Sequence, residues 1–226
     1  MRLMPTTTVG RKLAMAASGQ FMVFYVTAHV LGNTTIFAGA INAYADGLRH
    51  GPFILVLWSS RTLLLLSAAI HIYYGIVLKL ENWGAKPEAY AVRGYRSATV
   101  AGRTMIWSGV VIAAFLLFHI LHFTLQAIVP GLAAKTHPDA LGRPDVLSMV
   151  VGNFRHAGIA AIYVIGVFAL GLHLYHGIQS SVQTEGLNNE RTLPLFTKAG
   201  IIASVLLFLG YAAIPVAILT GLLNHR

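Results

Sequence analysis

Six of the ten histidines lie inside long apolar stretches of the sequence. They are His29, His71, His119, His122, His173 and His176. An ionisable side chain inside a membrane is energetically costly, so these histidines are candidates for a functional site. Neutral imidazole binds iron well, and two imidazoles can fill both axial positions of a haem. The other four lie near the expected surface and carry no such expectation: His50, His137, His156 and His225.

Distance along the predicted helices sorts four of these histidines into two levels. His29 and His119 lie roughly 25 Å from the basic residues that begin their stretches, in the outer half of a membrane. His71 and His173 fall in the inner half, because their stretches run in the opposite direction. The sequence therefore predicts two histidine pairs on four helices, which suits two stacked haems. A zinc site is disfavoured, because its ligands would converge at one depth.

Two further features bear on this haem hypothesis. The chain has no cysteine, so both haems would be held noncovalently, as b-type haem. Gly75 and Gly177 follow His71 and His173 by four residues on the same helix face, and Gly32 follows His29 by three. A glycine at this spacing leaves room for a flat macrocycle, although it serves close helix packing equally well. His122 and His176 remain alternatives to His119 and His173 as ligands.

The composition indicates the elements that must position these histidines. Of the 226 residues, 56% are hydrophobic and only 10% are charged, which excludes disorder and disfavours a soluble domain. Five apolar stretches are each long enough to cross a hydrocarbon core of about 30 Å as a helix. They cover residues 13–40, 53–80, 105–129, 157–178 and 199–223. We expect residues 1–226 to form one all-α domain, a polytopic bundle of five transmembrane helices that binds two b haems.

The loops predict an orientation for this bundle. With the N-terminus inside, ten Lys and Arg residues fall on inner segments and six on outer segments, which favours that topology. The net charge of +9 then reflects topology and anionic lipid, and no nucleic-acid partner is expected. The first stretch lacks a cleavage site at a signal-like distance, so we expect it to be a retained span. Pro215 predicts a kink in the last span.

Several short motifs share their order and spacing with one family of membrane proteins. The chain resembles the di-haem cytochrome b anchor subunit of succinate dehydrogenases and fumarate reductases, in the class with one five-helix anchor chain. The resemblance covers at least residues 10–190. The matching stretches are 10–19 (GRKLAMAASG), 28–33 (AHVLGN), 42–45 (NAYA), 70–75 (IHIYYG), 82–87 (NWGAKP), 103–109 (RTMIWSG), 118–123 (FHILHF), 173–180 (HLYHGIQS) and 183–186 (QTEG).

This resemblance implies a function. Such a chain anchors a flavoprotein subunit and an iron–sulfur subunit on the inner face of a prokaryotic cytoplasmic membrane. Electrons from succinate pass through the partner subunits and two haems to a quinone, with menaquinone suggested by the class. The quinone half-reaction of the enzyme would belong to this chain. By family position, His71 and His173 would ligate the inner haem, and His29 and His119 the outer one.

Weaker expectations concern the surroundings of the haems. Haem propionates need basic partners near span ends, and four residues lie at suitable depth: Arg61, Lys79, Arg103 and Arg155. Polar side chains that would suit a quinone gather near the outer end: Asn33, Asn42, Tyr44, Arg49 and His50. The basic loop from Lys79 to Arg103 would help to position the soluble partners, and the fifth span would serve packing or an oligomer interface.

Two other functions remain open. The nearest is the di-haem quinone cytochrome of another respiratory complex, such as nitrate reductase, formate dehydrogenase or hydrogenase. Those proteins usually concentrate their ligands on fewer helices. A haem-free transporter with functional histidines belongs to a different class. It is disfavoured because all seven Asp and Glu residues lie outside the predicted spans, whereas coupled carriers commonly use a membrane carboxylate.

Overall fold

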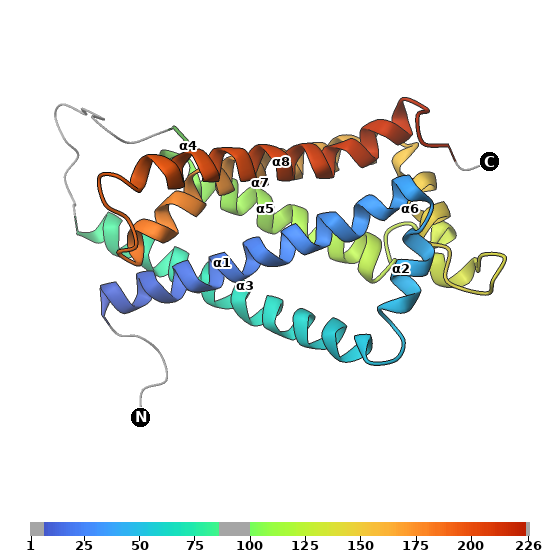
Figure 1. Cartoon of the computed structure of the whole chain (residues 1–226), viewed down its shortest axis with the longest axis horizontal. Coiled ribbons are helices and arrows are strands. Elements are labelled where there is room, and N and C mark those ends of the chain that lie inside the picture. The colour runs from blue at the N-terminus through green and yellow to red at the C-terminus, as the bar shows by residue number, and fades with distance from the viewer. Residues whose placement is uncertain (1–6, 86–99, 225–226) are drawn as a thin grey trace.

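The chain folds as an elongated bundle of helices, seen in a computed structural model that describes residues 7–85 and 100–224 (Figure 1). Within these ranges, five helical segments are long and apolar enough to cross a membrane. These spans are Thr8–Ala38, Phe53–Gly84, Met105–Thr124, Ala157–Thr184 and Leu193–Leu219. They are built on α1 (Thr8–Thr34), α3 (Phe53–Gly84), α5 (Met105–His119), α7 (Ala157–Thr184) and α8 (Leu193–Leu219). No strand occurs in the described ranges. The predictions of an all-α chain and of five potential spans are confirmed, and they indicate a multi-pass membrane protein.

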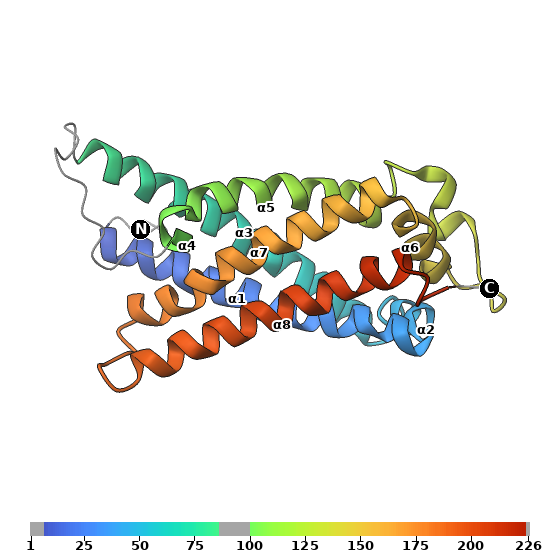
Figure 2. The ribbon, with the colours of Figure 1, turned by 90° about the horizontal axis from the view of Figure 1, so that it is seen from above.

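The long helices run along one axis, and the short elements gather at the two ends (Figures 1 and 2). We call the end where α1 begins the N-side end, which also holds α4 (Val100–Arg103). The opposite, C-side end holds α2 (Ile41–Gly47) and α6 (Val146–Phe154). The number of long helices is odd, so the last of them, α8, finishes at the C-side end, opposite to where α1 begins.

Contacts between the helices bring the histidine-bearing helices together. Helix α1 lies against α3, α7 and α8, while α7 also lies against α5 and α8 (Figure 2). Hydrocarbon offers no hydrogen-bonding partner, so each span satisfies its backbone groups internally as a helix. The helices then meet through side chains. Gly166 of α7 allows such a contact, since a Cβ atom built on it would lie 2.3 Å from the ring of Phe115 on α5.

Most buried apolar residues lie at the C-side end. Phe154, Ala160, Tyr163, Ile214 and Ile218 belong to one cluster between α6, α7 and α8. Helix α3 is different, because only Tyr74 and Leu78 on it are buried. Most of its leucines and isoleucines are exposed, as suits a helix that meets lipid.

Several boundaries differ from the predicted spans. Helix α3 continues to Gly84 and includes Glu81, whose carboxylate pairs with Arg11 of α1. The third span is shorter than the predicted 105–129. Helix α5 stops at His119, and a π-helical turn, η2 (Ile120–Thr124), follows it. Helix α8 runs through Pro215 as one continuous helix. Hydropathy marks where lipid contact is tolerable, whereas the helix ends depend on local caps and contacts.

A short polar loop closes the C-side end between the third span and α6. Asp139 accepts hydrogen bonds from the backbone N–H groups of Leu141 and Arg143 and forms an ion pair with the Arg143 side chain at 2.7 Å. Asp145 caps α6 by accepting from Ser148 N at 3.0 Å. The amide of Asn42 on α2 donates to Asp145 Oδ1 at 3.0 Å. These bonds hold α2, the loop and α6 together.

Candidate functional site

The first candidate centre is the N-side pair, His71 of α3 and His173 of α7. Their ring centroids lie 6.1 Å apart with an interplanar angle of 65°. His71 Nδ1 lies 3.0 Å from the carbonyl oxygen of Met15. A carbonyl oxygen can only accept, so His71 Nδ1 carries the proton. The lone pair of this imidazole is then on Nε2.

A similar deduction applies to His173. Its Nδ1 lies 3.1 Å from Ser108 Oγ on α5. The Ser108 hydroxyl has one proton, which it donates to the carbonyl oxygen of Met105 at 3.0 Å. Ser108 therefore accepts from His173 Nδ1–H, and the lone pair of His173 is also on Nε2. Both rings of the N-side pair are in the tautomer that a metal-ligating histidine requires when its Nδ1–H is hydrogen-bonded.

The second candidate centre is the C-side pair, His29 of α1 and His119 of α5. Their ring centroids lie 6.0 Å apart with an interplanar angle of 82°. Tyr25 stacks on His29 at 5.8 Å, and Tyr211 of α8 lies 6.1 Å from it. The side-chain amide of Asn33 lies 3.2 Å from His29 Nε2. A ligand to His29 Nε2 would therefore displace the Asn33 amide.

The two pairs lie at different levels of the bundle. His71 contacts Met15, which precedes His29 on α1 by 14 residues, or about 21 Å of helix. His173 contacts Ser108, which precedes His119 on α5 by 11 residues, or about 16 Å. Four helices thus bring together His71 with His173 and His29 with His119, one pair above the other.

The remaining two histidines of the spans are engaged elsewhere. His122 is 3% exposed, and both its ring nitrogens have partners. Its Nδ1 lies 2.9 Å from the Tyr163 hydroxyl and its Nε2 lies 2.8 Å from Asn153 Oδ1. His176 packs against α4, where a Cβ atom built on Gly102 would lie 3.0 Å from its ring. His122 is thus hydrogen-bonded at both ring nitrogens, whereas His176 lies against α4.

The distance between the ring centroids in each pair fits two imidazoles bound to the same metal ion. A metal–nitrogen bond is about 2 Å long, and the ring centroid lies about 1 Å beyond the nitrogen. Two imidazoles on opposite sides of one metal ion therefore have centroids about 6 Å apart. Both pairs meet this value. Each pair offers two nitrogens, the number that a bis-histidine haem iron takes from protein, since the macrocycle supplies the other four. The described ranges hold no group of three or more His, Cys, Asp or Glu that could bind a metal ion.

The glycines beside these histidines divide into two kinds. A Cβ atom built on Gly75 meets no atom of the described residues within 4 Å, and one on Gly177 meets only Met105 Cε at 4.0 Å. The faces beside His71 and His173 are therefore open to a flat group. Gly32 is different, because a Cβ atom there would lie 2.3 Å from the Tyr44 hydroxyl. The expectation that Gly32 leaves room for a macrocycle is wrong, since Tyr44 fills that space.

The predicted propionate partners occupy both ends of the bundle. Arg61 on α3 is partly buried, lies 5.3 Å over the Trp58 ring and interacts electrostatically with Tyr25 beside His29. Lys79 lies 5.1 Å over the Trp83 ring at the N-side end, where Arg103 ends α4. Arg155 is exposed just before α7. Of the four, Arg61 has the clearest relation to a histidine pair.

The predicted quinone-binding residues do not form one site. Asn33 lies beside His29 on α1. Tyr44 of α2 packs against Gly32, which is also on α1. Asn42 instead holds the C-side loop through Asp145 and the backbone N–H of Leu147. Arg49 donates to the carbonyl of Ala45, and His50 Nδ1 contacts the carbonyl of Asp46, so both side chains are turned back toward α2.

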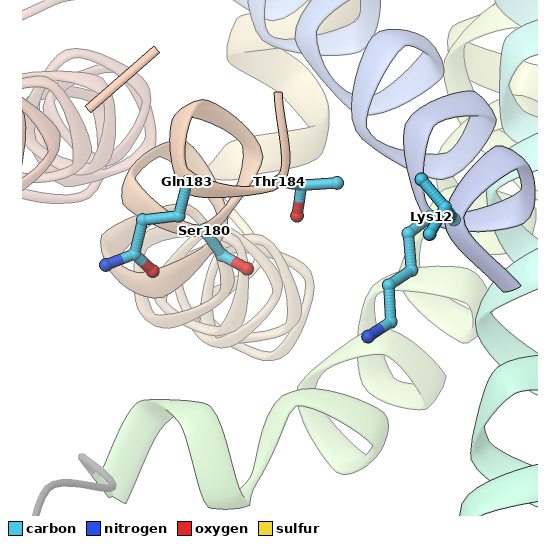
Figure 3. Close-up of a pocket in the computed structure, with 5 residues that line it drawn as sticks. Lys12, Ser180, Gln183 and Thr184 are labelled. Atoms are coloured by element: carbon cyan, nitrogen blue, oxygen red, sulfur yellow. The ribbon is translucent and has the colours of Figure 1, made fainter. Parts of the chain in front are cut away.

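A cavity of about 310 Å³ opens between α1 and α7 at the N-side end. Lys12 borders it from α1, and Ser180 and Thr184 face it from α7, with Gln183 and Val9 completing the lining (Figure 3). An ammonium, two hydroxyls and an amide can bind the oxygens of a polar headgroup. The basic loop from Lys79 to Arg103, predicted to act at this end, lies mostly outside the described residues.

Three important side chains do not stand out in the sequence: Ser108, Asn153 and Tyr163. Each touches a histidine only through the tertiary structure. A hydrogen-bonding side chain inside an apolar span, as at Ser108 and Tyr163, is the one sequence signal that could have identified two of them.

Comparison with known proteins adds no identification, because no protein-family model, curated protein or solved structure matches this chain.

Proposed function

We propose that this chain is a di-haem cytochrome b that carries electrons between the two faces of a membrane. The observation that supports it best is the arrangement of two histidine pairs, with ring centroids 6.1 and 6.0 Å apart, at two levels of one helical bundle. Haem would supply reversible one-electron transfer at each level. Two redox groups one above the other suit a path across the bilayer.

In this proposal the protein would hold the two haems, orient their histidine ligands and shield the haems from water. His71 and His173 would hold the N-side haem, and His29 and His119 the C-side haem. Met15 and Ser108 keep His71 and His173 in the tautomer with a free Nε2. The guanidinium of Arg61 would neutralise a propionate of the C-side haem. The apolar faces of the helices would keep water away from the two haems.

The proposed physiological partner is the soluble part of succinate dehydrogenase or fumarate reductase. This rests on the order and spacing of the motifs, from the stretch 10–19 to the stretch 183–186. A flavoprotein and an iron–sulfur subunit would dock at the N-side end, which carries Lys12, Lys79 and Arg191. The excess of basic residues at this end favours its placement in the cytoplasm of a prokaryotic cell.

The electron acceptor would be a membrane quinone, with menaquinone suggested by the class. Asn33 and Tyr44 remain the best candidates to meet it at the C-side end, since both lie near His29. Gln126 offers a hydrogen-bond acceptor there, which would suit the hydroxyl of the reduced quinol. Its φ of 56° is in the left-handed region, and its buried Oε1 has no hydrogen-bond partner among the described residues. Strain and an unpaired polar atom together often mark a ligand site.

One measurement tests the central proposal. The full chain is purified with any partners that remain bound, and a dithionite-reduced minus oxidised spectrum and a pyridine haemochrome assay are recorded. We expect about two b haems per chain. A folded preparation without haem would contradict the proposal and leave a transporter or a purely structural anchor. Succinate-dependent quinone reduction by the native complex then tests the succinate partner separately from haem binding.

A further inference from the structure

A chain of four polar side chains extends from His119 to the base of α6. Tyr163 Oη lies 3.4 Å from His119 Nδ1 and 2.9 Å from His122 Nδ1. His122 Nε2 lies 2.8 Å from Asn153 Oδ1, and Asn153 Nδ2 donates to the carbonyl oxygen of Met149 at 2.9 Å. Tyr163, His122 and Asn153 are 7%, 3% and 2% exposed, so this chain has little access to water.

The donor and the acceptor of each hydrogen bond in this chain can be assigned by starting from its last member, the Met149 carbonyl oxygen. The Met149 carbonyl can only accept, so the Asn153 amide must present Nδ2 to it and Oδ1 to His122. Asn153 Oδ1 can only accept, so the proton of His122 is on Nε2. Charging His122 in a dry site without a carboxylate would be costly, so the ring is neutral and its Nδ1 is a lone pair. Tyr163 therefore donates its only proton to His122 Nδ1.

The consequence reaches His119. With its proton committed to His122, the Tyr163 oxygen can only accept from the second imidazole. His119 Nδ1 is then the protonated nitrogen, and its lone pair is on Nε2. We infer that Tyr163, oriented by His122 and Asn153, is a positioning residue that sets the tautomer and the ring orientation of His119. This inference rests on the proposed function, in which His119 Nε2 binds the C-side haem.

The same role is filled differently at the other level. Ser108, one residue whose proton is committed to a backbone carbonyl, accepts from His173. At the C-side level the accepting oxygen belongs to a tyrosine, and its proton is fixed by two further side chains. An acceptor on Nδ1–H makes the opposite nitrogen a better electron donor to the metal. Removing either oxygen should therefore raise the reduction potential of the haem at its own level.

The test is Tyr163→Phe in the full chain, purified as for the haem assay. The substitution keeps a ring among Phe115, Phe123 and Phe154, which surround Tyr163. We expect both haems to bind and the C-side haem to become easier to reduce by about tenfold at fixed applied potential, or about 59 mV for one electron. The EPR signal of that haem should change, and the N-side haem should keep its potential and signal.

Two matched variants locate the effect. Ser108→Ala should produce the same shift at the N-side haem. Tyr211→Phe keeps a ring whose centroid lies 6.1 Å from that of His29 and removes a hydroxyl that donates to the carbonyl oxygen of Val26 at 2.6 Å, so neither potential should change. The C-side signals are assigned as those missing from His119→Ala. If Tyr163→Phe does not accumulate, His122→Phe removes the acceptor that orients the Tyr163 hydroxyl. It should shift the C-side potential in the same direction but by less, because the Tyr163 oxygen remains near His119.

The outcomes separate the two proposals. Two bound haems with an unchanged C-side potential and EPR signal in Tyr163→Phe would overturn the inference and leave the proposed function intact. A shift of both haems together would also overturn it, because that indicates a general loosening of the bundle. An unsubstituted chain that binds no haem would overturn the proposed function and the inference with it.

Discussion

At the scale of single residues, the proposed haem chemistry depends on His29, His71, His119 and His173. Each of these imidazole rings lies about 6 Å, centroid to centroid, from one other ring of the four, so the four histidines form two pairs. An imidazole that loses its opposite ligand cannot hold haem iron in the same six-coordinate state. The four residues should therefore behave as two independent couples.

We predict that each His→Ala substitution at these four positions lowers the haem content from about two to about one per chain. His29→Ala and His119→Ala should remove the same spectral component, and His71→Ala and His173→Ala the other. Difference spectra and the pyridine haemochrome assay measure this. His50→Ala, at an exposed position on the C-side surface, is the control and should keep both haems. Loss of one common component by His29→Ala and His71→Ala would contradict the pairing.

Gly75 tests whether the open face beside His71 is occupied by a cofactor. An added methyl group meets no described protein atom within 4 Å, and alanine favours a helix over glycine by about 1 kcal/mol. We expect Gly75→Ala to fold normally but to weaken binding of the N-side haem, seen as lower haem content after extended washing.

The matched control for this substitution is Gly84→Ala, on the same helix and equally free of described neighbours within 4 Å. It lies 13 residues beyond His71, so it should leave haem content unchanged. Equal haem retention in the two variants would show that the macrocycle does not lie over Gly75.

At the scale of elements, the contact between α5 and α7 depends on Gly166. A methyl group there would overlap the Phe115 ring, with a Cβ–Cγ distance of 2.3 Å. We expect Gly166→Ala to destabilise the folded protein by about 1–3 kcal/mol, the usual range for overpacking. Unfolding in detergent measures it. Gly158→Ala, on the same helix with no described neighbour within 4 Å, should have little effect, and adding Phe115→Leu should rescue Gly166→Ala.

The C-side loop should respond to acid through Asp139. Hydrogen bonding and ion pairing with Arg143 hold the pKa of Asp139 down to about 2, from its usual 3.8. A carboxylate whose pKa is depressed on folding stabilises the folded loop above about pH 4 and loses this effect as the pH falls through about 2. We expect cleavage by pepsin near Leu141, which is 75% exposed, to accelerate between pH 4 and pH 2.

The control for this pH effect is Asp139→Asn, which lacks the titrating group. Its loop should already be cleaved rapidly at pH 4, with a smaller change on further acidification. Rates are corrected with a peptide substrate measured at each pH. An unsubstituted protein whose corrected rate stays constant from pH 4 to pH 2 would argue against a stabilising role for this ion pair.

At the scale of the whole molecule, five candidate spans would place the start of α1 and the end of α8 on opposite faces of a membrane. The bundle therefore has one face for the proposed soluble partners and another for the proposed quinone chemistry. Charge bias favours a cytoplasmic N-side end. The absence of cysteine from the sequence makes this orientation easy to test, since any introduced thiol is unique.

We predict that Arg191→Cys, in the loop between α7 and α8, reacts with a membrane-impermeant maleimide only after cells are permeabilised. Lys135→Cys, in the C-side loop, should react in intact cells. Both positions are exposed, so accessibility of the side chain is matched. The opposite labelling pattern would reverse the orientation and would place the proposed partners at the C-side end.

The sequence by itself determined the spans and the levels of the histidines. A helix that crosses the hydrocarbon core must be long and carry few charges, so length and hydropathy were enough to predict the five candidate spans. Helical rise is constant, so the levels of His29, His71, His119 and His173 followed from counting. Helix ends were less predictable, as the continuation of α3 to Gly84 and the π-helical turn after His119 show, because they depend on contacts between elements.

Only the tertiary structure decided what surrounds each histidine. Rotation of the helices about their axes brings Tyr163 and Asn153 to His122 and aims Ser108 at His173, and neither follows from depth. The same rotation places Tyr44 in the space beside Gly32, where the sequence left room for a haem. Depth is a property of one helix and can be counted along the chain. Which faces meet depends on how all the helices pack against one another, which one-dimensional periodicity does not contain.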